Sequence, residues 1–196
     1  MTILLKPDYF YHIYNHSVGK DNIFIIEENY KYFLERYIYY IYPIARTYAY
    51  CLLPNHFHFF DKIRSEEELN NIKEYFKNSN KEQFLTKQFS NLFSSYTQSY
   101  NKLYKRQGSL FNKSFKRKVV TEDSYYIKLI CYIHNNPVHH NIVTNIFDWK
   151  YSSFLSLLKE NINTKIEKEQ VLKLFKNKEY FLDFHLKNKW LELNEY

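Results

Sequence analysis

The order of the hydrophobic patterns in the N-terminal third is the feature that most limits how this chain can fold. Residues 8–18 are rich in aromatic and branched side chains, which predicts a strand. Residues 27–41 place apolar side chains at helical spacing, and Pro43 follows them, so we expect a helix that ends there. Residues 44–53 and 56–63 predict two more strands. A strand, a helix and two strands in succession predict an α+β fold.

The middle of the chain predicts a long helix, a basic strand and a second helix. Residues 83–104 carry aromatic and aliphatic side chains along one helical face, and residues 115–120 have the composition of a strand. Thr121 can cap the next helix, which we expect to run to about Asn135 before Pro137 ends it. A tail rich in Lys and Glu, with apolar residues at helical spacing, predicts one further helix near the C-terminus.

Glycine is scarce, and its scarcity excludes two classes of nucleotide site. Gly19 and Gly108 are the only glycines in 196 residues, and they lie far apart. A Walker loop or a dinucleotide-binding loop needs clustered glycines, so the sequence has neither. The 21 Tyr and 17 Phe residues are an excess that an AT-rich genome can produce, and it does not by itself indicate a function. Cys51 and Cys131 stand alone, so we expect two buried, reduced thiols.

No segment of the sequence indicates a membrane protein. No apolar run reaches the length of a membrane span. Residues 1–15 lack the long apolar region and the cleavage site of a signal peptide. We therefore expect a cytoplasmic protein without a membrane partner.

The positive charge is concentrated in one segment. The net charge is +7, yet residues 83–121 contain no Asp or Glu while holding eight of the 28 Lys and Arg residues. A solvated face usually carries both signs, so an acid-free basic segment predicts contact with nucleic acid. The candidates for contacts with a nucleic-acid backbone are Lys113, Lys116, Arg117 and Lys118, and weaker candidates are Lys102, Lys105 and Arg106.

Two histidines in the third predicted strand form the first candidate site. Alternate residues of a strand point to the same side, so His56 and His58 project together while Phe57 and Phe59 project into the core. Two imidazoles at this spacing can bind one divalent metal ion. The same triplet also fits two histidines on a half-exposed strand, and the triplet alone does not decide between the two interpretations.

Tyr132 and Asn136 form the second candidate pair. They lie four residues apart in a predicted helix and therefore share one face, one turn apart. Each also has an ordinary structural interpretation: Tyr132 as a tyrosine at the rim of the core, and Asn136 as the end of a helix before Pro137. Tyr125, seven residues earlier, lies on roughly the same face and is the rival for any role of Tyr132.

Several strings of the sequence, in this order, resemble one protein family. They are YHIYNHSVGK near the N-terminus, then PNHFH, GSLFNKSFKRKVV, YYIKLICYIHNNPV and DWKYSSF. Together they are similar to the REP-associated and insertion-sequence-type single-tyrosine HUH transposases, where HUH denotes histidine, hydrophobic residue, histidine. The resemblance covers residues 8–154. The later string QVLKLFKNKEYFLDFH is similar to an extension found in one branch of the family.

The resemblance implies a fold and an activity. The implied fold is a ferredoxin-like antiparallel sheet with helices mainly on one face, over residues 1–154, followed by a helical C-terminal extension over residues 155–196. The implied activity is metal-dependent cleavage and transfer of single-stranded DNA near hairpins through a 5′-phosphotyrosine. The expected partner is single-stranded or hairpin DNA, and the protein would act as a monomer or a homodimer. The alternative is a catalytically silent protein that binds hairpin DNA or RNA with the same fold.

The resemblance also assigns roles to single residues. Tyr132 takes the position of the nucleophile. The ligands of a divalent metal, Mg²⁺ or Mn²⁺, fall on His56, His58 and Asn136. A covalent phosphotyrosine would conserve the energy of the cleaved bond, so rejoining would need no ATP. This agrees with the absence of a nucleotide-binding loop.

The sequence departs from the family pattern at two positions. The family often has Arg after the Asn of the first strand, where this chain has His16 after Asn15; we expect DNA contacts there or another imidazole near the metal. Asp61 interrupts the apolar residues that usually follow the two histidines, and we expect an exposed strand end. His134 is expected on the surface of its helix. Structural or surface positions are expected for His12, His139, His140 and His185.

Overall fold

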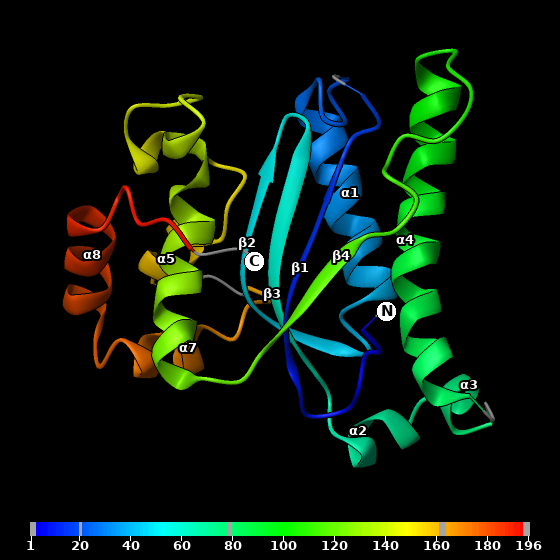
Figure 1. Cartoon of the computed structure of the whole chain (residues 1–196), viewed down its shortest axis with the longest axis horizontal. Coiled ribbons are helices and arrows are strands. Elements are labelled where there is room, and N and C mark those ends of the chain that lie inside the picture. Colours follow the sequence, from blue (N-terminus) through cyan, green and yellow to red (C-terminus); the bar gives the residue numbers. More distant parts are fainter. Residues whose placement is uncertain (1–2, 20, 78–79, 161–163, 194–196) are drawn as a thin grey trace.

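An antiparallel sheet of four strands forms the centre of the molecule. The structure is a computed structural model that describes residues 3–19, 21–77, 80–160 and 164–193. The strands are β1 (Phe10–His16), β2 (Ala45–Leu53), β3 (His56–Ile63) and β4 (Lys116–Val120). They lie in the order β2-β3-β1-β4, and neighbouring strands are antiparallel (Figure 1). This confirms the expected α+β class and the ferredoxin-like strand order.

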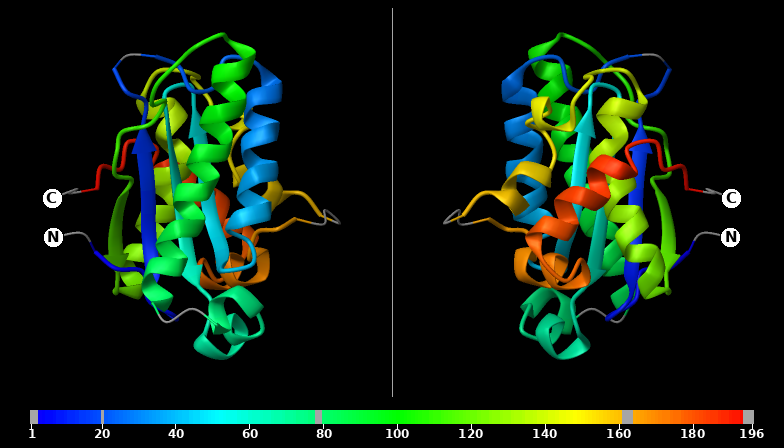
Figure 2. Two further views of the ribbon diagram at one scale, coloured as in Figure 1. Left: turned by 90° about the vertical axis from the view of Figure 1, so that its right-hand side faces the viewer. Right: turned by 90° about the vertical axis from the view of Figure 1, so that its left-hand side faces the viewer.

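Helices cover both faces of the sheet. They are α1 (Glu27–Tyr40), α2 (Glu66–Asn70), α3 (Lys73–Phe76), α4 (Lys81–Leu103), α5 (Asp123–His139), the 3₁₀ helix η1 (Ile146–Asp148), α6 (Phe154–Leu158), α7 (Lys168–Leu174) and α8 (Lys178–Lys187). α1 and α4 pack together on one face, and α5 lies on the other with α8 against it (Figures 1 and 2). The resemblance implies helices mainly on one face, whereas here helices pack on both faces of the sheet. Both faces of β3 are buried, so helices are needed on each side.

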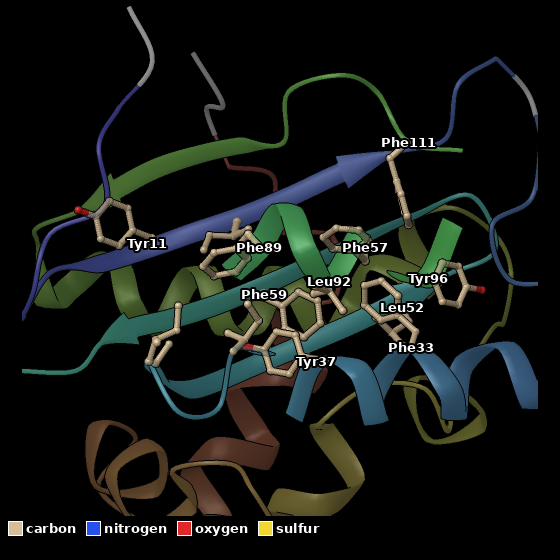
Figure 3. Close-up of a cluster of buried hydrophobic side chains, with 14 of the residues drawn as sticks. Tyr11, Phe33, Tyr37, Leu52, Phe57, Phe59, Phe89, Leu92, Tyr96 and Phe111 are labelled. Carbon is tan, nitrogen blue, oxygen red and sulfur yellow. The ribbon is translucent and has the colours of Figure 1, made fainter. Parts of the chain in front are cut away.

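One hydrophobic core lies between the sheet and helices α1 and α4 (Figure 3). Phe57 and Phe59 of β3 point into it, as the alternation of the strand predicts, and both are buried. Phe33 and Tyr37 of α1 and Tyr96 of α4 close it from the helix side. Burying one large apolar side chain contributes about 1.5–3 kcal/mol. This face therefore fixes the position of β3 and the direction in which its other residues point.

A second core lies between the sheet and α5. α5 supplies Leu129, Ile130 and Ile133, which are completely buried in the same cluster as Phe60 of β3. The next three residues, His134 to Asn136, are buried and polar, and the buried Pro137 and Val138 follow them. The apolar side chains thus anchor the helix and hold its buried polar residues over the sheet.

α5 begins and ends later than the sequence predicts. Its N-cap is Glu122 rather than Thr121, and it continues through Pro137 to His139. A proline in the last turn removes one backbone donor but leaves the preceding hydrogen bonds intact. The carbonyl of Pro137 accepts a hydrogen bond from the N–H of Ile142 at 2.9 Å. The helix therefore ends two residues after the proline and not before it.

The C-terminal extension forms two helices where the sequence predicts one. Lys176 adopts a left-handed conformation with φ +67°, which breaks the helical path after α7. Asn177 then begins α8 as its N-cap, because its side chain accepts a hydrogen bond from the N–H of Tyr180 at 2.7 Å. The first backbone N–H groups of a helix have no acceptor within the helix, and the side chain of Asn177 accepts from one of them.

The division expected after residue 154 stays a prediction. α6 runs across this position, and α7 contacts β2. The extension therefore packs on the same sheet as the rest of the chain. Residues 161–163 and 194–196 of the expected extension lie outside the described residues.

Two buried histidines tie α8 to α5. His185 donates from Nδ1 to the carbonyl of Phe181 at 2.7 Å, so its Nε2 accepts from Nδ1 of His134 at 2.9 Å. Nε2 of His134 in turn accepts from the hydroxyl of Ser153 at 2.7 Å. Both imidazoles are completely buried, so His134 does not lie on the helix surface as the sequence suggests. All four ring nitrogens have partners, which fixes the two helices relative to one another.

Asp61 is buried and does not lie at an exposed strand end. It accepts a hydrogen bond from the hydroxyl of Tyr37 at 2.6 Å, and that hydroxyl also lies 2.7 Å from Oγ1 of Thr47. Its second carboxylate oxygen has no hydrogen-bond partner within the described residues. Burial raises the pKa of Asp61 to about 7, although hydrogen bonds from Tyr37 and Thr47 oppose this. The sequence could not show this burial, because α1 provides the cover.

The raised pKa of Asp61 predicts a pH-dependent stability. Unfolded Asp61 ionises near 3.8 but folded Asp61 only near 7, so its contribution is fully present below the lower value. The contribution is lost as pH rises toward the higher value, by about 1.4 kcal/mol per pH unit. Urea unfolding measures the free energy of unfolding at pH 5 and at pH 7. Between these two pH values the wild type should lose about 2–3 kcal/mol more of this free energy than Asp61→Asn does. Asp183→Asn, at an exposed position, is the control, and parallel curves for wild type and Asp61→Asn would contradict the assignment.

Candidate active site

The register of β1 against β3 gathers histidines on the face of the sheet that α5 covers. His56 pairs with His16, and His58 pairs with Tyr14. Residues paired across antiparallel strands point to the same side, and His12, two residues before Tyr14, shares that side. His12, His56 and His58 are each no more than 3% exposed. The two histidines of β3 do project together, as their spacing predicts, but they are buried and not half-exposed.

His12 and His58 are joined by a buried hydrogen bond. Nε2 of His12 lies 2.9 Å from Nδ1 of His58, and the rings stack with centroids 5.1 Å apart. One of these two nitrogens must carry the proton. If it is Nδ1 of His58, the other nitrogen of that ring keeps a free lone pair, which is the usual arrangement of a histidine that binds a metal. His12 therefore lies directly beside a candidate ligand.

His56 has a defined orientation as well. Its Nδ1 lies 2.7 Å from Oδ1 of Asn55, and because an amide oxygen only accepts, Nδ1 is the donor. Nε2 of His56 is then the nitrogen with a free lone pair. The ring of His16 stacks on that of His56 with centroids 4.6 Å apart, and His140 lies edge-on at 4.8 Å. Of the two expectations for His16, the structure shows the imidazole close to a candidate ligand.

Tyr132 and Asn136 reach the histidines from α5. The half-buried ring of Tyr132 stands nearly perpendicular to that of His58, with centroids 5.7 Å apart. Asn136 is completely buried, and its Nδ2 donates to the carbonyl of Tyr132 at 3.0 Å. Oδ1 of Asn136 has no hydrogen-bond partner in the part of the chain that the structure describes. The two candidate pairs, distant in sequence, thus face each other.

Burial keeps the imidazoles of the site neutral. It lowers the pKa of His56 to about 3 and the pKa of His58 well below its usual value, and neighbouring histidines lower both further. Burial also lowers the pKa of His12 to about 3, with the charge of Lys118 as the second cause. Asn136 opposes the lowering at His56, so its amide lies close to that ring. Neutral imidazoles present lone pairs, which is the form that binds metal ions.

The donor set fits a divalent metal with open coordination positions. No group of three or more His, Cys, Asp or Glu side chains is arranged to hold a metal among the described residues; the donors here are two imidazoles and one amide oxygen. The unpartnered Oδ1 of Asn136 favours a ligand, because a buried acceptor without a partner costs about 1–3 kcal/mol. Two nitrogens and an oxygen suit Mn²⁺ better than Mg²⁺, which prefers oxygen donors.

Two of the predicted DNA contacts lie on the same face of the sheet as the histidines. Lys118 pairs with His12, and Lys116 pairs with Tyr14. Arg117 points to the opposite face, where its guanidinium lies over the ring of Phe115 at 4.6 Å and burial lowers its pKa. β4 thus places two lysines beside the candidate site and one arginine against the α4 side.

Other residues expected at DNA hold structural contacts. Arg106 forms an ion pair with Asp21 at 3.2 Å. Asn15 is buried, and its amide donates to the carbonyl of Asn112 at 3.3 Å. Lys113 is exposed beside an open groove of about 450 Å³ between α4 and the segment that follows it. The exposed candidates of the basic segment are Lys102, Lys105, Lys113 and Lys116. Contacts of all these residues with DNA stay predictions.

Three further imidazoles lie around the site, where the sequence did not predict them. His12 contacts His58, His140 contacts His56, and the ring of His139 lies 5.7 Å from that of Tyr132. A signal for His12 was present, because alternate residues of the first strand are His, Tyr and His, a pattern similar to that of the third strand. The sequence did not show which strands pair. His139 and His140 follow Pro137, where a helix was not expected.

Comparisons with known proteins support the family resemblance. The chain is 27% identical over 115 residues to a curated protein of Haemophilus influenzae that carries the provisional name REP-associated tyrosine transposase. This match covers 58% of the chain and only 60% of the relative's length. No protein-family model matches the chain.

A solved structure shares the fold. It is a REP-associated tyrosine transposase bound to a REP hairpin, with a TM-score of 0.59 and 13% sequence identity, over 84% of this chain and 87% of that one. At this identity the likeness shows the fold alone. In the described part of the chain, no helix is long and apolar enough to cross a membrane.

The unpartnered oxygen of Asn136 predicts a conflict between stability and ligand binding. Asn136→Leu should raise the free energy of unfolding by about 1 kcal/mol in the presence of a chelator, because an apolar side chain removes the buried unsatisfied acceptor. The neighbouring Asn135→Leu is the matched control. Asn135 donates to the carbonyls of Cys131 and His185, so its loss should destabilise the chain. Urea unfolding of both variants measures this, and a clear loss of stability in Asn136→Leu would contradict it.

Proposed function

We propose that this chain is a single-tyrosine transposase of the REP-associated type, which cleaves single-stranded DNA near a hairpin and transfers the cleaved strand. One observation carries the proposal: the ring of Tyr132 is held 5.7 Å from that of His58, on the same side as the unpartnered oxygen of Asn136. A nucleophile and a set of metal donors meet at one place. The names of the relatives agree with this activity.

Tyr132 would act as the nucleophile. Its hydroxyl oxygen attacks the phosphorus of a phosphodiester, and the bond to the 3′ oxygen breaks. The tyrosine hydroxyl loses a proton and the departing strand gains one, so that strand leaves with a 3′ hydroxyl. The other strand end stays on the tyrosine as a 5′-phosphotyrosine. A later attack by a 3′ hydroxyl on this ester reverses the chemistry and joins a strand without ATP.

His56, His58 and Asn136 would hold a divalent metal, Mn²⁺ or Mg²⁺. When bound, the metal supplies positive charge to a phosphate oxygen and orients the phosphate for attack. The chain's own contribution is to fix the donors: Asn55 fixes the ring of His56, and His12 fixes the ring of His58. Burial keeps both rings neutral, so they are ready to bind without first losing a proton.

Lys116 and Lys118 would contact the phosphates of the DNA strand. They lie on the histidine face of β4, and Lys118 is close enough to His12 to lower the pKa of that imidazole. A phosphodiester that reaches Tyr132 therefore meets positive charge along the edge of the sheet. Hairpin DNA is the proposed partner, because a relative of the same fold was solved with a REP hairpin.

A covalent adduct is the direct test of the nucleophile. Incubation of the protein with single-stranded hairpin DNA and Mn²⁺ should give a protein–DNA adduct on a denaturing gel. Tyr132→Phe should abolish the adduct. Tyr125→Phe is the control at the rival position, where the tyrosine ring lies beside Lys118, and it should retain the adduct. An adduct in Tyr132→Phe would show that the assignment is wrong. DNA binding without any adduct across a range of hairpins would favour the catalytically silent binding protein.

Metal affinity tests the role of His12. We expect His12→Phe to weaken Mn²⁺ binding by about 10- to 100-fold, because His58 loses the partner that fixes its ring. His12→Gln should recover most of the affinity, since its amide oxygen can accept from Nδ1 of His58. The measurement is the electron paramagnetic resonance signal of free Mn²⁺ during titration, and it does not depend on DNA cleavage. Wild-type affinity in His12→Phe would exclude this role.

A further inference from the structure

A row of aromatic rings leads from the sheet to the surface through Tyr132. Beyond Tyr132 lies His139, with ring centroids 5.7 Å apart, and beyond His139 lies Trp190, with centroids 5.9 Å apart and the ring planes only 19° from parallel. The row begins at His58, which is buried, and ends at Trp190, which is 59% exposed. Trp190 is thus the outermost ring of a row of contacting rings that contains the candidate nucleophile, and it stacks on His139.

The segment that carries Trp190 is fixed to α5. The carbonyl of His185 accepts from the amide of Asn135 at 3.3 Å, and the carbonyl of Asn188 accepts from the thiol of Cys131 at 3.7 Å. His139 also forms a hydrogen bond through Nε2 to the carbonyl of Lys189. These contacts hold the chain after α8 against the last turns of α5, the helix that carries Tyr132 (Figure 1). Trp190 therefore has a defined position near the nucleophile.

The exposure of Trp190 contrasts with that of the other tryptophan. Trp149 is half-buried, donates from its indole N–H to the carbonyl of Leu52 at 3.0 Å and packs edge-on against Tyr151. Trp190 leaves most of its surface to solvent. Of the two tryptophans, Trp190 is thus the one whose indole ring is accessible to a ligand.

We propose that Trp190 is a stacking platform for an unpaired base of the DNA strand, next to the phosphate that Tyr132 attacks. This inference rests on the proposed function, because it takes Tyr132 as the nucleophile. An aromatic ring stacks on any base, since every base has a π face, and proteins that bind single strands use such rings along the backbone path. The stack on His139 holds the indole ring in place before the base arrives.

The charges around the ring favour stacking as its main contact. The ammonium of Lys189 lies 5.7 Å from the centre of the Trp190 ring and can pair with a phosphate. Burial lowers the pKa of His139, while the carbonyl of Lys189 and the carboxylate of Glu192 oppose that lowering. An acidic group is therefore close to the same place. Because charges of both signs lie near the ring, we expect the segment to contact DNA mainly through the flat face of Trp190.

Binding measurements on Trp190 variants test the proposal. A single-stranded oligonucleotide that carries a hairpin and an unpaired flank is titrated into protein with Tyr132→Phe, which prevents cleavage. In this background Trp190→Ala should weaken binding by about 5- to 150-fold, the range that base stacking on an aromatic ring provides. Trp190→Phe should stay close to the parent, because phenylalanine also stacks. Tyr180→Ala is the matched control, an exposed aromatic of α8 that should have no effect.

Fluorescence gives a second reading in the same titration. Binding should quench part of the tryptophan emission, and Trp190→Phe should remove that part. Unchanged affinity in Trp190→Ala would overturn the stacking role, and tighter binding would show instead that the ring blocks the site. Absence of DNA binding and of an adduct in the protein with Tyr132 intact would overturn the proposed function, so the two failures are distinguishable.

Discussion

The candidate site depends on the register between β1 and β3. This register places His12, Tyr14 and His16 on the same side as His56 and His58. A shift by one residue would turn the imidazoles of one strand to the opposite face, because side chains alternate along a strand. The opposite face prevents that shift. There Ile13 of β1 pairs with Phe59 of β3, and both are buried against α1 and α4. One core thus sets the geometry of chemistry on the other side of the sheet.

The buried polar groups beneath α5 lower the free energy of unfolding. Other contacts of the helix must offset this cost. Imidazoles that stay neutral and an amide oxygen without a partner are unfavourable in a buried layer. Leu129, Ile130 and Ile133 hold α5 by apolar burial. The buried hydrogen bond between His134 and His185 ties α5 to α8. The residues that anchor α5 and the candidate functional residues therefore alternate along one helix, with Tyr132 between Ile130 and Ile133.

The sequence was most informative where a pattern is local. The period of two predicted that His56 and His58 share a side, and the spacing of four predicted that Tyr132 and Asn136 share a helix face. The proline signal misplaced the helix end because a proline in a last turn costs little. The burial of Asp61 and the contacts of His12 come from strand pairing and from distant helices. No local pattern contains those partners, so the immediate surroundings of both candidate ligands could not be predicted.

The contacts of the extension favour a site built within one chain. The ring of Tyr132 meets His58 of its own sheet, and α5 is tied to α8 by the buried pair of His134 and His185. If α5 moved to the sheet of a second copy without α8, those buried nitrogens would lose partners, at about 1–3 kcal/mol for each unsatisfied group. Such a movement would have to carry α8 along. In this structure the extension holds α5, and with it Tyr132, over the sheet of its own chain.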